Sequence, residues 1–137
     1  MSKKYLVTGA AGFIASQVSK QLLDQGDHVV GVDNLNDYYD VRLKNWRLEQ
    51  LKVHPNTVNF TFSDLDIEDQ ANLSDLFQAH GPFDAVLNLA ARAGVRYSME
   101  NPHVYLSTNA EGTLNLLECM REYGYSKFVL ASTSSLY

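Results

Sequence analysis

Residues 8–14, with the sequence Thr-Gly-Ala-Ala-Gly-Phe-Ile, have the types and spacing needed to bind an anion. Gly9 and Gly12 stand between a short apolar run typical of a strand and a periodic run typical of a helix. Glycines at such a corner let the backbone turn tightly and approach a ligand, and the free N–H groups of the first helical turn attract negative charge. The sequence therefore predicts a site for a dinucleotide pyrophosphate, with a purely structural turn as the alternative.

An acidic residue, Asp33, ends the next strand-like run of the sequence. It follows the glycines at about the 20-residue distance that dinucleotide-binding sites show. A carboxylate at this place accepts hydrogen bonds from both ribose hydroxyls of adenosine, and its charge repels a 2′-phosphate. The cofactor predicted from this pair of features is NAD in preference to NADP. The alternative is that Asp33 only ends a strand at a turn.

Composition narrows the class of protein further. The chain has 137 residues, 16 acidic against 11 basic, a formal net charge of -5 and no basic cluster, so we expect no nucleic-acid partner. The lone Cys119 fits a reducing compartment. No apolar run is long enough to span a bilayer and no signal peptide is evident, so we expect no membrane partner and a cytoplasmic location. The four histidines lack the spacing of metal ligands, which predicts no metal site.

The elements that must position these residues alternate along the chain. We expect strands near 4–8, 28–33, 58–62, 84–89 and 127–132, and helices near 13–25, 41–52, 70–79 and 101–122. Several strands are continuous apolar runs, which is typical of strands covered on both faces. The predicted fold class is α/β, a Rossmann-type doubly wound parallel sheet with strand order 3-2-1-4-5, and residues 1–137 are expected to form one domain.

Four segments carry a resemblance to a known family, and they are residues 8–14, 32–40, 88–98 and 131–137. They resemble the extended short-chain dehydrogenases/reductases, the NAD-dependent epimerase/dehydratase family, and within it the nucleotide-sugar epimerases of the UDP-glucuronate 4-epimerase type. The resemblance implies that the chain is the N-terminal, NAD-binding part of an enzyme whose substrate is a UDP-sugar. It further implies that UDP-glucuronate and UDP-galacturonate are interconverted by transient oxidation at C4.

The resemblance also implies which residues bind the cofactor. They are Gly9, Gly12, Phe13, Ile14, Asp33, Asn34, Asp64, Leu65, Leu89, Ala90, Ala91, Thr108 and Asn109. Asp64 and Leu65 resemble the family's adenine clamp, although Asp64 and Asp66 are equally suited to cap the helix that follows. The small residues 89–91 suit a close approach to the nicotinamide ribose, or tight packing alone. A bridge between helix and strand is the alternative for Asn109.

On the substrate side, the resemblance implies that Thr133 hydrogen-bonds the sugar hydroxyl that is oxidised. It places Arg96, Ser134 and Ser135 near the sugar, where an arginine suits a carboxylate or phosphate. A surface ion pair is the alternative for Arg96. In the family a Tyr-x-x-x-Lys pair acts as the general base, and we expect this pair outside the chain because Tyr123 stands too early. The isolated chain is therefore expected to lack turnover.

The chain departs from the family pattern in two ways: a third glycine is replaced, and we expect the later strands, the catalytic helix and the sugar-binding domain outside residues 1–137. Ala15 stands where a third glycine is usual, so we expect a slightly wider approach of helix and strand.

In the predicted helix 101–122, Leu114 and Leu116 lie about 160° apart, so only one of them can face the sheet. The other apolar face predicts a homo-oligomer formed through this helix. Alternative functions are a dehydratase, decarboxylase or reductase of the same superfamily, or a nucleotide-binding module without catalysis.

Overall fold

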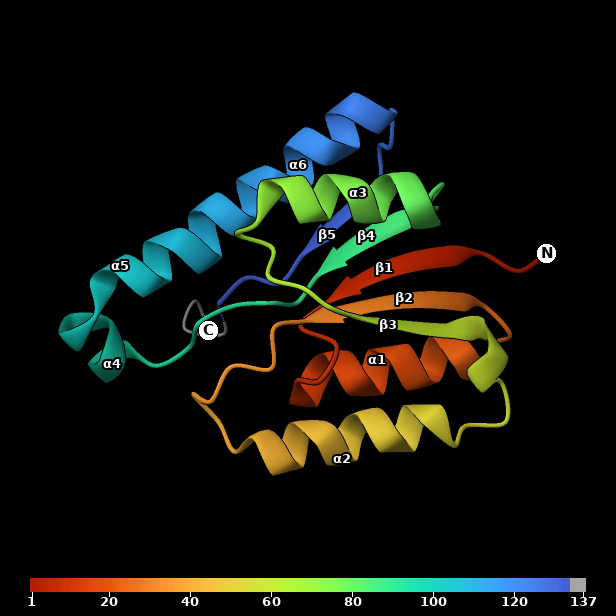
Figure 1. The fold of residues 1–137 in the computed structure, drawn as a ribbon, viewed down its shortest axis with the longest axis horizontal. Coiled ribbons are helices and arrows are strands. Elements are labelled where there is room, and N and C mark those ends of the chain that lie inside the picture. Colours follow the sequence, from red (N-terminus) through yellow and green to blue (C-terminus); the bar gives the residue numbers. More distant parts are fainter. Residues whose placement is uncertain (134–137) are drawn as a thin grey trace.

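A computed structural model describes residues 1–133 as a parallel sheet with helices on both faces (Figure 1). The strands are β1 (Lys4–Thr8), β2 (His28–Asp33), β3 (Phe60–Asp64), β4 (Ala85–Asn88) and β5 (Phe128–Leu130). Every neighbouring pair is parallel, and the order is β3-β2-β1-β4-β5. The predicted fold class and strand order are confirmed.

Two helices cover each face of the sheet. Helices α1 (Phe13–Asp24) and α2 (Val41–Lys52) lie on one face, and α3 (Gln70–His80) and α6 (Gly112–Tyr123) lie on the other (Figure 1). Asp40 and Asp69 cap α2 and α3, because each carboxylate accepts a hydrogen bond from a backbone N–H of the first turn. Helix α6 ends at Gly124, whose φ of 78° is readily adopted by glycine.

Alternate residues of the central strand enter two separate cores. Leu6 of β1 packs in the cluster under α3 and α6, with Phe77 and Leu116 among its members. Val7 packs in the cluster under α1 and α2, together with Ala15. Because successive side chains of a strand point to opposite faces, one continuous apolar run fills both cores. Ala15 is accommodated there at 2% exposure.

Element boundaries differ most from the prediction at two places, and β4 and β5 are shorter than predicted. A short 3-10 helix, η1 (Thr57–Asn59), occupies the expected start of the third strand, so β3 begins at Phe60 and runs to Asp64. The single helix expected over 101–122 is divided into α5 (Pro102–Tyr105), a π-helical turn η2 (Leu106–Glu111) and α6, and a short helix α4 (Val95–Glu100) precedes them. Within residues 1–133, no helix is long and apolar enough to cross a bilayer.

Candidate functional site

A pocket opens where the carboxyl ends of the first four strands meet, at the point where the chain order reverses between β1 and β4. This is where doubly wound sheets bind their ligands. Nine of the predicted cofactor residues line it together: Gly9, Gly12, Asp33, Asn34, Leu65, Leu89, Ala90, Ala91 and Thr108. Eight of them lie at or just after the carboxyl ends of four strands, Thr108 lies in the π-helical turn η2 (Leu106–Glu111), and the topology brings them to one place.

The glycine corner forms one wall of the pocket. Gly9 has a φ of 67°, and a Cβ atom built on it would lie 3.0 Å from the Cα of Ala90 and from the carbonyl oxygen of Leu89. The Gly12 N–H donates to the Gly9 carbonyl at 2.8 Å, which closes the turn. Among the described residues, no side chain caps the start of α1. The N–H groups of its first turn therefore remain available to an anion at this end of the helix.

The Asp33 carboxylate is held at the base of the pocket with 8% exposure. Its Oδ2 accepts from the Ala11 N–H at 3.1 Å and its Oδ1 from the Leu35 N–H at 2.8 Å. The Ala10 N–H also donates to the Val32 carbonyl at 3.0 Å, so the glycine corner is fastened to the end of β2 at two points. A carboxylate has about four acceptor positions, so Asp33 keeps capacity for a ligand hydroxyl.

Thr8 organises the opposite wall, and the sequence analysis did not single it out. Its buried hydroxyl donates to Asn88 Oδ1 at 2.6 Å and accepts from the N–H groups of Leu89 and Ala90, both at 3.0 Å. Asn88 Nδ2 donates in turn to the Thr113 hydroxyl on α6 at 3.0 Å. The backbone of the loop after β4 is thereby fixed against β1, next to Gly9.

Asp64, the acid predicted at the adenine end, lies outside the pocket lining. Asp64 is the last residue of β3; it is exposed and lines a different groove, with Asp75 and His80. The pocket is lined instead by Asp66 and Ile67, next to Leu65. The cause is the later start of β3, because a strand that runs to Asp64 moves the following loop along the chain. Asp66 accepts from Asn34 Nδ2 at 3.0 Å and from the Glu68 N–H at 2.9 Å.

Three other predicted cofactor residues place their side chains outside the pocket lining. Phe13 and Ile14 are 72% and 64% exposed and do not line the pocket. What they can offer a ligand is their backbone N–H groups, which belong to the first turn of α1. Asn109, in the π-helical turn, donates to the Arg92 carbonyl at 3.1 Å and accepts from the Arg92 N–H at 2.8 Å. It bridges η2 and the loop after β4, which is the kind of bridge left open as the alternative.

Comparisons with known proteins agree with this geometry. Residues 6–137 match the family model described as GDP-mannose 4,6 dehydratase. The chain is 55% identical over 133 residues to the UDP-glucuronate 4-epimerase of Thermodesulfobacterium geofontis, covering 97% of this chain and 40% of that protein. The chain belongs to the NAD-dependent epimerase/dehydratase family.

Solved structures of the family have the same fold. A variant of the UDP-glucuronic acid 4-epimerase from Bacillus cereus, in complex with a fluorinated UDP-sugar and NAD, is 38% identical with a TM-score of 0.83, covering 98% of this chain and 41% of that one. The UDP-glucose-4-epimerase from Stenotrophomonas maltophila, with bound NAD, is 32% identical with a TM-score of 0.84, covering 98% and 38%. The chain spans about 40% of the length of the curated relatives it matches.

One Tyr-x-x-x-Lys spacing does occur in this family member, at Tyr123 and Lys127. The structure separates the two residues from the pocket. Tyr123 ends α6 and stacks on Phe77 and Tyr125, at the amino edge of the sheet, and the helix stops before it reaches Lys127. A general base must lie within hydrogen-bond reach of its substrate, so this pair does not serve the pocket.

The predicted substrate residues are only partly described. Arg96 lies on α4, is exposed and does not line the pocket. Thr133 follows β5 at the carboxyl edge of the sheet and is exposed. Ser134 and Ser135 lie outside the described residues. These four assignments stay predictions.

Eight residues that line the pocket were not predicted: Val32, Asn36, Tyr38, Tyr39, Lys44, Asp66, Ile67 and Arg92. A sequence signal existed for Lys44, because it shares the buried face of α2 with Leu48 and Leu51 at helical spacing. Tyr38 lines the mouth, and its hydroxyl donates to the Ala93 carbonyl at 3.0 Å. No local sequence pattern predicts this contact, because the two residues lie 55 positions apart in the chain.

Proposed function

We propose that the chain is the NAD-binding part of a nucleotide-sugar epimerase that interconverts UDP-glucuronate and UDP-galacturonate. The observation that carries the proposal is the placement of Asp33, a buried carboxylate fastened by backbone N–H groups beside the glycine corner. The identity of 55% to a UDP-glucuronate 4-epimerase supports the choice of reaction. UDP-glucuronate is the substrate named for that relative, and we extend this substrate to the present protein.

The residues present fit NAD. The corner at Gly9 and Gly12 leaves backbone space and N–H donors for the pyrophosphate, and Asp33 has acceptor capacity for ribose hydroxyls. Leu65 and Ile67 supply apolar surface at the pocket end formed by the loop after β3. We assign the acid beside them to Asp66 in place of Asp64.

When bound, NAD would supply the redox chemistry, which is reversible hydride transfer at C4 of the sugar. This chain would orient the nicotinamide end through the backbone of residues 89–91, which Thr8 holds in place. Thr133 would hydrogen-bond the sugar hydroxyl. A threonine hydroxyl near its ordinary pKa is a poor base, so we propose that the tyrosine and lysine base pair belongs to a part of the protein other than residues 1–137. We also propose a cytoplasmic location and a homo-oligomer.

Calorimetry tests the cofactor assignment. NADH should bind the protein more tightly than NADPH, and Asp33→Ala should weaken NADH binding and narrow the difference between the two. The matched control is Asp64→Ala, which removes an acid outside the pocket lining and should leave both affinities unchanged. An unmodified protein that binds neither nucleotide contradicts the proposal.

The product formed from UDP-glucuronate tests the reaction. The protein extended by its natural continuation should form UDP-galacturonate with catalytic NAD, whereas residues 1–137 alone should not. Chromatography with mass detection separates the alternatives, since a decarboxylase releases carbon dioxide and forms a UDP-pentose, and a dehydratase forms a product lighter by one water. Epimerisation by residues 1–137 alone would show that the base lies within them.

A further inference from the structure

We infer that Lys44 is a second charged residue of the ribose site and that it moderates the selection of NAD over NADP. The inference rests on the proposed function only in taking the pocket as the site of a dinucleotide. Asp33 is the negative member of the site, and the structure places a positive one directly beside it. Cofactor preference then depends on the pair and not on the carboxylate alone.

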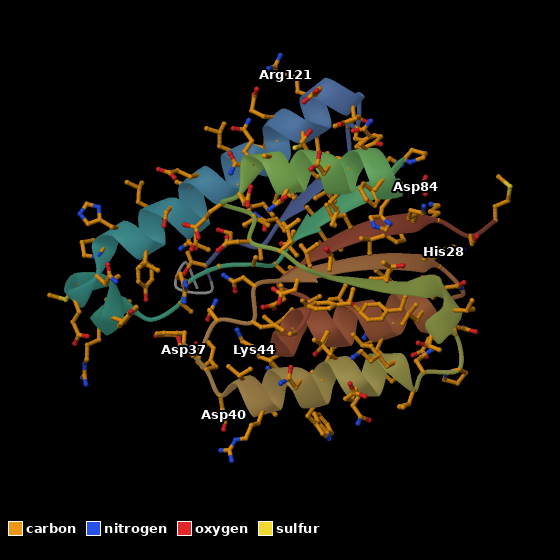
Figure 2. All side chains as sticks on the ribbon, in the orientation of Figure 1. His28, Asp37, Asp40, Lys44, Asp84 and Arg121 are labelled. Carbon is orange, nitrogen blue, oxygen red and sulfur yellow. The ribbon has the colours of Figure 1, made fainter. Side chains whose placement is uncertain are left out.

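Lys44 is a buried cation on an otherwise apolar helix face. It lies on α2 with 6% exposure and lines the pocket together with Asp33. In Figure 2 it lies at the same end of the molecule as Asp37 and Asp40, opposite to His28 and Asp84. Lysine is almost never fully buried without a partner, because the loss of hydration destabilises the charge. Its partners therefore indicate what the charge is for.

The contacts of the ammonium leave it with donor capacity toward the pocket. Lys44 Nζ donates to the Asn36 carbonyl at 2.9 Å and lies 3.4 Å from Asn36 Oδ1. It lies 3.8 Å from Asp33 Oδ1, which is an ion pair without a short hydrogen bond. An ammonium has three N–H donors, and only the carbonyl contact is short. A ribose hydroxyl that donates to Asp33 can therefore accept from Lys44 at the same time.

The charge of Lys44 also changes how the site treats a 2′-phosphate. A lone Asp33 carboxylate in a buried position would repel a phosphate strongly, since charges interact more strongly where water is excluded. The adjacent ammonium offsets that field and offers the phosphate a direct partner. The other acid of the pocket lining, Asp66, is hydrogen-bonded by Asn34 and comes from the loop after β3. Lys44 should therefore favour NADPH more than it favours NADH.

Binding of NADH and NADPH to Lys44→Met tests the inference, because methionine keeps the apolar stem and removes the charge. We expect the affinity for NADPH to fall about tenfold more than that for NADH, so the preference for NADH widens. Lys44→Arg keeps the charge and should keep the ratio close to that of the unmodified protein. Lys52→Met removes an exposed lysine from the same helix and should change neither affinity.

Three outcomes would overturn the inference. Equal losses of affinity for NADH and NADPH would show that Lys44 only holds the loop at Asn36 against α2. Unchanged affinities would show that Lys44 has no role in nucleotide binding. A smaller preference for NADH over NADPH in Lys44→Met would show that Lys44 acts in the opposite direction. Thermal unfolding establishes that Lys44→Met is folded, and Lys44→Gln replaces it in the same comparison if it is not. An unmodified protein that binds neither nucleotide contradicts the proposed function, whereas an unchanged ratio contradicts this inference alone.

Discussion

Two backbone segments meet at the pocket because Gly9 has no side chain. The loop after β1 passes the loop after β4 so closely that a Cβ atom on Gly9 would lie 3.0 Å from backbone atoms of Ala90 and Leu89. Backbone atoms cannot move aside as the end of a flexible side chain can. At the scale of single residues, the site depends as much on which atoms are missing as on which are present.

Gly9→Ala should therefore destabilise the protein and weaken NADH binding. The positive φ costs about 1–2 kcal/mol for an alanine, and the backbone clash adds to it. Gly26→Ala is the matched control, because Gly26 has a φ of 83° and no heavy atom within 4 Å of its Cβ position. Urea unfolding and calorimetry measure the two effects. Equal losses of stability in both variants would show that the close approach contributes nothing.

Thr8→Val should lower the free energy of unfolding by about 2–3 kcal/mol, since the change removes the hydroxyl that pairs with Asn88 Oδ1 and with the N–H groups of Leu89 and Ala90. NADH affinity should fall with it, because that loop lines the pocket. Thr8→Ser keeps the hydroxyl and should recover most of both losses. A stability of Thr8→Val equal to that of the parent would contradict the role given to this hydroxyl.

At the scale of elements, α6 packs closely against one residue of the pocket lining. Gly112, at the start of α6, faces Ile67, which is 4% exposed and lines the pocket. A Cβ atom on Gly112 would lie 2.6 Å from Ile67 Cδ1. The π-helical turn just before it places Thr108 at the pocket and Asn109 against Arg92. π-helical turns within α-helices are frequent at the functional sites of proteins.

Gly112→Ala should destabilise the fold by about 1–3 kcal/mol through overpacking, although alanine is the better helix former. Ile67→Ala removes Cδ1 and Cγ1, the two atoms that would lie 2.6 and 2.7 Å from the new methyl group. The double variant should therefore be more stable than the sum of the two single changes predicts. Thermal unfolding of all four proteins completes the cycle. Additive effects would show that the two side chains do not compete for the same space.

At the scale of the whole molecule, α6 has two apolar faces, as predicted. Leu116 is fully buried against the sheet, whereas Leu114 and Leu117 are 56% and 41% exposed. The preceding turn adds Leu106, at 59% exposure. An exposed apolar stripe of this kind is typical of a surface that another chain or segment covers.

We therefore expect self-association through α6, and Leu114→Glu should shift the protein toward the monomer. Sedimentation over a range of concentrations measures the change. Leu43→Glu is the control, because Leu43 is a similarly exposed leucine, at 45%, on α2. A protein that stays monomeric at high concentration, or an equal effect of both substitutions, would contradict the prediction.

A second property of the whole molecule is the protection of its only cysteine. Cys119 is buried on α6, and burial raises the pKa of its thiol, with the charges of Glu122 and Glu118 acting in the same direction. The thiolate is the reactive form, so alkylation by iodoacetamide at pH 8 should be slow in the folded protein and fast in urea. Mass spectrometry follows the reaction. Rapid labelling without urea would contradict this burial.

The sequence by itself determined the strands, the sheet order and the glycine corner. The strands and the corner follow from local residue patterns, and the order follows from the right-handed crossovers that join parallel strands. Three patterns can be recognised without knowing which segments are in contact. They are the glycine spacing, the acid at the end of the second strand and the apolar runs at regular intervals. The predicted helix 41–52 has the observed bounds of α2, where Asp40 accepts a hydrogen bond from a backbone N–H of the first turn.

Only the tertiary structure decided the remaining parts of the site, because they depend on contacts between residues far apart in the chain. Thr8 meets Ala90 across 82 positions, and the burial of Lys44 beside Asp33 requires α2 to lie against the end of β2. Which acid after the third strand lines the pocket also depends on tertiary structure, because pairing with β2 sets where β3 ends: Asp33 pairs with Asp64, which leaves Asp66 for the loop. Register and packing are properties of the assembled sheet, and no segment contains them alone.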